Sequence, residues 1–167
     1  MKELLDKLSS YNVFNYLLPG VLFATFVDGL TSFRILQKDI AVGVFVYYFL
    51  GSVVSRVGSL FIEPVLRKVG IVKFAPYADF VRVSKTDPKL DVLSEANNMY
   101  RTFCSLMICV GVVSLYDRAS SSWPALQKAA PTVLIAGLFF LYLLSYKKQT
   151  AYISKRIEAS TTQDGKL

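Results

Sequence analysis

Four polar residues in apolar stretches of the sequence have the side chains best suited to chemistry. They are Asp28, Arg56, Asn12 and Asn15. An ionisable group inside an apolar span costs free energy unless it meets water, an opposite charge or a polar neighbour. These residues are therefore candidates for a pore, an ion path or a network of hydrogen bonds between helices. Asp28 has no acidic partner at its depth, which argues against acid–base catalysis there.

Arg56 is the sharpest of these candidates. If a helix enters the membrane at Ile40, Arg56 lies about 24 Å along it, inside or at the inner rim of the hydrocarbon. Asn12 and Asn15 reach the same depth on a helix that runs the opposite way, and they share a face. We expect the guanidinium to bond to these amides, and the alternative is that it snorkels to lipid headgroups.

Two faces of small residues predict close contacts between helices. Gly20, Ala24 and Asp28 recur at a spacing of four, and such faces usually turn toward protein in membranes. The second face consists of Gly51, Ser55 and Ser59. We expect contacts through one of these faces to build a homo-oligomer, although small faces also serve packing within one protomer. For Asp28, the alternative is a place at the outer interface.

The residues of common enzymatic sites are missing from the sequence. It contains no histidine, which excludes His-based zinc sites and the commonest general base. Its nine glycines form no phosphate-binding loop. Cys104 and Cys109 lie five apart in one apolar run, where small packing residues are expected. The sequence therefore predicts a non-enzymatic protein with no cofactor, no metal ion and no catalytic residue.

The composition is typical of a membrane protein. Of its 167 residues, 53% are hydrophobic and 19% are charged, whereas about a quarter are charged in an average soluble domain. A chain this short cannot bury that much apolar surface in its own interior. We therefore expect an all-α, polytopic membrane protein whose first partner is the lipid bilayer.

Four apolar runs predict four transmembrane helices in a single membrane domain. Each run approaches the about 20 helical residues needed to cross the bilayer. The four runs cover residues 11–33, 40–62, 99–116 and 131–146. An amphipathic segment, 1–10, precedes them, and the connection 63–98 and the tail 147–167 complete the chain.

The connection 63–98 carries local structural signals. Pro64 is expected to kink or restart the helix, and Glu63 and Arg67 can pair on its surface because they are four apart. Asp87 followed by proline predicts a helix start. A helix from there to about residue 116 would be longer than the bilayer core is thick. We therefore expect two of the four helices to extend into the cytoplasm.

The distribution of lysine and arginine predicts the orientation. Fifteen of these 19 residues lie on the side that holds both termini and 63–98. By the positive-inside rule, both termini are expected in the cytoplasm, at the cell inner membrane. These charges suit anionic lipids, and because no aromatic platform accompanies them we do not expect nucleic acid. Segments 63–98 and 147–167 are the candidates for binding a cytoplasmic protein partner.

The residues from Ser10 to Gly20 read SYNVFNYLLPG. This phrase resembles the opening of small four-span proteins carried in prokaryotic antiviral loci, including accessory proteins beside RNA-guided CRISPR effectors. The resemblance covers only the start of the chain and contains no chemical motif. It implies a defence accessory or effector that acts at the inner membrane.

Three classes of function follow from these patterns. The first is a non-enzymatic, oligomeric inner-membrane effector or sensor that forms a pore, alters permeability or relays a cytoplasmic signal. The second is a membrane scaffold or accessory subunit of a larger complex without a pore. The third is a small transporter or membrane-embedded enzyme, which is the least expected because the sequence lacks an internal repeat and clustered acids.

Overall fold

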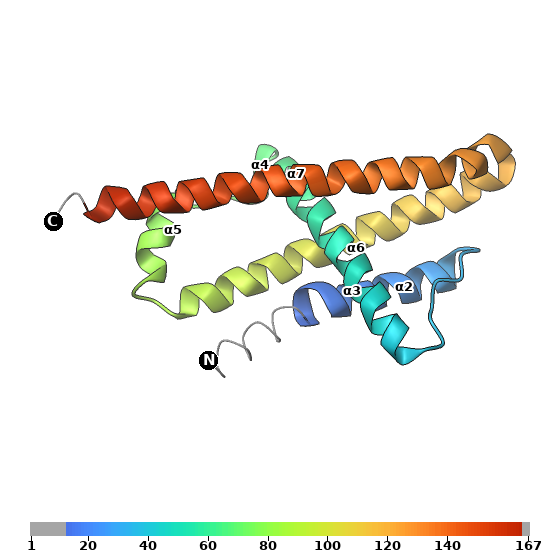
Figure 1. The fold of residues 1–167 in the computed structure, drawn as a ribbon, viewed down its shortest axis with the longest axis horizontal. Helices are drawn as coiled ribbons and strands as arrows, with labels where there is room; N and C mark the ends of the chain where they lie inside the picture. Colours follow the sequence, from blue (N-terminus) through green and yellow to red (C-terminus); the bar gives the residue numbers. More distant parts are fainter. Residues whose placement is uncertain (1–12, 165–167) are drawn as a thin grey trace.

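The computed structural model describes residues 13–164, and it confirms an all-helical chain. Figure 1 shows two long helices, α6 (Lys89–Ser122) and α7 (Pro124–Asp164), which meet at Trp123 and separate toward their other ends. A third helix, α3 (Ile40–Val57), crosses and contacts both. The described part of the chain contains no strand.

Three helices are long and apolar enough to cross a membrane: Ile40–Lys68, Lys89–Ser122 and Pro124–Thr161. The first joins α3, η2 (Gly58–Ile62) and α4 (Glu63–Lys68) without a break. Only 22, 22 and 11% of the most apolar stretches of the three helices are buried. Most of their apolar surface therefore needs cover from lipid or from another chain. The first predicted span corresponds to a shorter apolar helix, Asn15–Leu30.

A π-helical turn precedes each of two prolines. The turn η1 (Val13–Leu17) leads into α2 (Leu18–Leu30), whose second residue is Pro19. The turn η2 leads into α4, whose second residue is Pro64. Proline has no N–H to donate, and its ring crowds the carbonyl four residues earlier, a clash that a wider turn relieves. Pro64 therefore changes the hydrogen-bond pattern of the helix without ending it.

The helices α2 and α3 touch at two glycines, in what we call the glycine contact. A Cβ atom on Gly20 would overlap the carbonyl group of Tyr47, and one on Gly51 would overlap that of Tyr16. Ala24, one turn after Gly20, is 0% exposed. The two backbones are therefore in direct contact, at a distance that only glycine permits.

A small apolar core joins α2, α3 and α6. It consists of Val27, Val54, Leu106 and Val110. Within this core, the Ser105 hydroxyl of α6 donates to the carbonyl oxygen of Val54 at 2.7 Å. The contact between α3 and α6 is therefore both apolar and hydrogen-bonded.

The helix α5 (Tyr77–Ser84) contacts α6 and α7 at the end where these two helices have separated (Figure 1). Its apolar face turns inward, with Val81 only 1% exposed. The Tyr77 ring centre lies 5.9 Å from that of Tyr152 on α7. The carboxylate of Asp87 accepts from the first backbone N–H of α6 at 3.0 Å, and this helix begins at Lys89, one residue after the predicted start at Pro88.

The two long helices extend beyond the predicted spans. The helix α7 begins at Pro124, includes Pro131, and continues through most of the segment predicted as a tail. Proline suits the first turn of a helix because the N–H it lacks has no partner there. The helix α6 likewise passes its predicted end at Tyr116. Trp123 alone therefore connects the two helices, in place of the longer outer loop that the sequence suggested.

Candidate functional site

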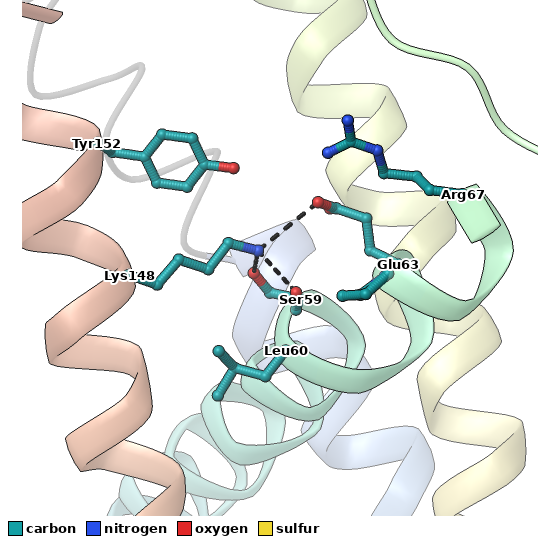
Figure 2. A pocket seen from close by; sticks show the side chains of 7 residues that line it. Ser59, Leu60, Glu63, Arg67, Lys148 and Tyr152 are labelled. Carbon is teal, nitrogen blue, oxygen red and sulfur yellow. Dashed lines mark hydrogen bonds and ion pairs between the residues drawn. The ribbon is translucent and has the colours of Figure 1, made fainter. Parts of the chain in front are cut away.

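Three helices meet at a buried acidic residue. Glu63, at the start of α4, is 8% exposed. Its Oε2 lies 2.7 Å from Nη1 of Arg101 on α6, and its Oε1 lies 3.6 Å from Nζ of Lys148 on α7. Figure 2 shows Lys148 reaching across to Glu63 and to Ser59. We call Ser59, Glu63, Arg101 and Lys148 the charged junction.

The π turn supplies an acceptor for Lys148. Its Nζ donates to the carbonyl oxygen of Ser59 at 2.6 Å and to the hydroxyl of Ser59 at 2.8 Å. In a regular helix that carbonyl would accept from the N–H of Glu63, but η2 directs this N–H to Gly58. The next residue, Pro64, has no N–H to offer. The Ser59 carbonyl therefore lacks a helical donor and can accept from the lysine.

Glu63 ends a line of buried residues that recur every four positions: Gly51, Ser55, Ser59 and Glu63. Residues at this spacing drift by about 40° per step around a regular helix, or about 120° over the line. The wider turn η2 removes part of this drift, because a π turn holds more residues than an α turn. The first three were predicted from the sequence as a packing face, whereas Glu63, the next member of the same pattern, was predicted only as half of a surface pair.

The predicted surface pair of Glu63 and Arg67 is replaced by other contacts. Both carboxylate oxygens of Glu63 face cations on α6 and α7. The guanidinium of Arg67 lies 5.1 Å from the centre of the Phe74 ring. Opposite charges attract more strongly where water is partly excluded, so Glu63 pairs with buried partners distant in sequence rather than with its neighbour in the helix.

The charged junction holds more positive than negative charge. Two cations face one carboxylate, and the side chains of Glu63, Arg101 and Lys148 are only 10, 18 and 26% exposed. Nε of Arg101 is buried, and no described residue accepts a hydrogen bond from it. The arrangement can tie three helices together or attract an anion.

Arg56 on α3 points toward η1, the first helical turn that the structure describes. It is half-buried, and its Nη2 donates to the hydroxyl of Tyr16 at 3.3 Å. Asn15, predicted as a partner, is the preceding residue and is 2% exposed. Asn12, the other predicted partner, lies outside the described residues. Counting residues along the two helices placed Arg56 at this level of the first helix, and among residues 13–164 its guanidinium donates to the side chain of Tyr16.

Asp28 organises the segment that follows α2. Its Oδ1 accepts from the backbone N–H groups of Ile35 at 3.0 Å and Leu36 at 3.4 Å, and its Oδ2 lies 3.8 Å from Nη1 of Arg34. These partners lie in the connection between α2 and α3. The contacts favour the interfacial interpretation of Asp28 over a role in a pore or ion path.

The two small-residue faces are occupied within one protomer. Gly20 and Ala24 pack on α3 through the glycine contact. Ser55 lies 3.4 Å from the Thr102 hydroxyl of α6, and Ser59 binds Lys148 of α7. The residues of both faces thus pack within one protomer, which is the alternative that the sequence left open.

Neither a metal site nor a known relative identifies the protein. Within residues 13–164, no group of three or more His, Cys, Asp or Glu side chains could hold a metal ion. In comparisons with known proteins, no family model, no curated protein and no solved structure matches the chain. The charged junction is therefore the feature from which a function must be argued.

Proposed function

We propose that this protein spans the inner membrane four times, with both termini in the cytoplasm, and acts there as a non-enzymatic, homo-oligomeric effector or sensor. A change in its cytoplasmic part is transmitted to its spans and alters membrane permeability, in the simplest case by opening a pore. The observation that carries the proposal is the charged junction. It couples the helix Ile40–Lys68 to two helices that continue past it.

The lengths of α6 and α7 support this coupling. They contain 34 and 41 residues, or about 51 and 61 Å of helix, against about 30 Å of hydrocarbon. Continuous helices transmit a displacement along their axes. A partner that moves α5, which contacts both helices, would therefore shift Arg101 and Lys148 relative to Glu63.

The exposed face of α7 supports an oligomer contact at a new place. Opposite the buried side of this helix lie Phe139, Leu143, Tyr146, Ile153 and Ile157, all at least 48% exposed. Their steps of three, four and seven match the apolar repeat of helices that pack side by side. Ile157 lies about 16 Å beyond the predicted span end at Tyr146, where lipid no longer covers it. This apolar face continues from the predicted span into the part of α7 that water surrounds. A second copy of α7, packed side by side with the first, would cover the face along its whole length.

The experiment is a flux measurement on the purified full chain in sealed vesicles. We expect wild-type protein to release a small trapped dye, and Glu63→Gln to change the rate at least severalfold because the junction loses its only carboxylate. Asp79→Asn, which breaks an exposed pair with Arg82, is the control and should leave the rate unchanged. Absence of flux from well-folded oligomers would contradict the proposal.

The second candidate function is a membrane scaffold or accessory subunit without a pore. The apolar residues Ile153 and Ile157, exposed on the part of α7 beyond the predicted span, favour it. Recovery of a stoichiometric protein partner, together with vesicles that retain their dye, would select this candidate.

The proposed topology is tested separately by labelling Gln37→Cys and Ser121→Cys from outside, in a background without Cys104 and Cys109. Protection of both sites would contradict that topology.

A further inference from the structure

An open hollow of about 400 Å³ lies beside the charged junction, between the start of α4 and α7 (Figure 2). Its walls include Ser59, Leu60, Glu63, Arg67, Lys148 and Tyr152. A second hollow of about 170 Å³ shares Lys148 and Tyr152 and adds Lys155. The two hollows share these two side chains and are neighbours along this face of α7, and we call them together the strip.

The charges around this strip favour an anion. Arg67, Lys148 and Lys155 line it, and Arg101 stands behind Glu63 in the junction. Three cations thus line the two hollows against one carboxylate, and that carboxylate already faces Arg101 and Lys148. An anion entering the strip would meet an excess of positive charge and the phenol group of Tyr152.

The depth of the strip favours a lipid over a soluble anion. Ser59 and Leu60 belong to the last turn of the predicted span 40–62, and Arg67 follows in the next turn. In the proposed topology this level is the inner membrane surface, where phospholipid phosphates lie. Leu60 and Pro64 give the hollow an apolar wall, which suits the glycerol and first methylene groups of a lipid.

We propose that this strip binds the phosphate group of an anionic phospholipid headgroup. Arg67 and Lys148 contact the phosphate from the two walls of the larger hollow, beside the hydroxyl of Tyr152. Lys155 adds positive charge from the second hollow. Lys148 is also a member of the charged junction, so a bound phosphate competes with Glu63 and Ser59 for the same ammonium group. The inference rests on the proposed topology, and it is independent of whether the protein alters permeability.

The test is thermal unfolding of the purified full chain in a neutral detergent, with short-chain phosphatidylglycerol as the probe. We expect a saturable rise of the unfolding temperature with lipid concentration. Arg67→Gln and Lys155→Gln should each weaken the apparent affinity about fivefold, the loss of one exposed charge-assisted contact. Lys68→Gln and Arg156→Gln remove the same charge from the adjacent positions, outside the strip, and should leave the affinity unchanged.

Two further probes identify the source of the phosphate. The first probe is glycerol phosphate in place of the lipid. The same saturable rise of the unfolding temperature, with the same pattern among the variants, would support the phosphate site and assign it to a soluble ligand. An equal rise with short-chain phosphatidylcholine, or equal weakening in all four variants, would overturn the proposal, since the effect would then come from chain insertion or from diffuse surface charge. Failure of the flux experiment leaves these outcomes unaffected, so the two proposals are tested separately.

Discussion

The glycine contact and the charged junction hold the same helix, Ile40–Lys68, in opposite ways. At the glycine contact, α2 and α3 touch through backbone atoms, and a single added methyl group would overlap a carbonyl of the other helix. At the charged junction, long side chains from α6 and α7 reach a carboxylate across a partly open space. The first contact is short-ranged and steric, whereas the second is electrostatic and spans three elements.

The difference separates a fixed part of the molecule from an adjustable one. Close-packed backbones have one arrangement, because any displacement produces overlap or a void. Flexible lysine and arginine side chains can follow a moving partner over a few ångströms and keep much of their attraction. We therefore expect the pair of α2 and α3 to act as a rigid base and the junction to respond to charge and ligands.

The largest effect should come from removing the carboxylate of the junction. Glu63→Gln leaves Arg101 and Lys148 without a counter-charge in a largely buried place, and we expect the free energy of unfolding to fall by about 3 kcal/mol. Titration with a denaturing detergent in mixed micelles measures this change.

A matched control comes from an exposed ion pair. Arg82 lies 2.8 Å from Asp79 with side chains 68 and 48% exposed, so Asp79→Asn should change the same free energy by less than about 0.5 kcal/mol. Equal effects of the two substitutions would mean that the junction is no stronger than a surface pair, and the comparison would fail.

The next effect should come from the glycine contact. Gly51→Ala places a Cβ against the carbonyl of Tyr16, and forced separation of α2 from α3 should cost about 1–3 kcal/mol of unfolding free energy. Gly111→Ala is the control, because nothing lies within 4 Å of the added atom and alanine favours a helix by about 1 kcal/mol. The two substitutions should therefore have opposite signs, and a shared sign would contradict the steric account.

The smallest effect should come from a hydrogen bond between the two regions. The hydroxyls of Ser52 on α3 and Tyr142 on α7 lie 2.8 Å apart. A double-mutant cycle of Ser52→Ala with Tyr142→Phe should give a coupling of about 0.6 kcal/mol, as is usual for interhelical bonds in membranes. Strictly additive changes would show that this pair of hydroxyls contributes nothing to the contact between α3 and α7.

The helical class and the start of α6 could be predicted from sequence because their causes are local. Apolar runs of nearly twenty residues require helices, and the carboxylate of Asp87 caps α6 within three residues of chain. The bounds of α7 were missed because Pro124 and Pro131 both suit a helix start, and only the fold decides between them. The close approach of Gly20 and Gly51 was expected as small-residue packing, but the sequence could not decide between contact within one protomer and contact between copies.

The partners at the candidate site could not be predicted because they depend on rotation about helix axes. Counting residues fixes depth, which placed Arg56 beside the first helix, but a rotation by one residue exchanges Asn15 for Tyr16. Two π turns alter these rotations, and no pattern in the sequence analysis located them. The ion pair of Glu63 with Arg101 joins residues 38 positions apart, so spacing along one helix could only suggest Arg67.

In the proposed topology, the connection through Trp123 alone has a consequence for how the chain would enter the membrane. A long loop between two spans must carry many unpaired backbone polar groups across the bilayer. The connection between α6 and α7 is a single residue, so almost all of the backbone here is hydrogen-bonded within helices. In the proposed topology, the two helices therefore insert together as a hairpin during synthesis, not one after the other. Arg101 and Lys148 would then reach the membrane in the same insertion step. Glu63, which is synthesised earlier, would have neither cation as a partner until that step.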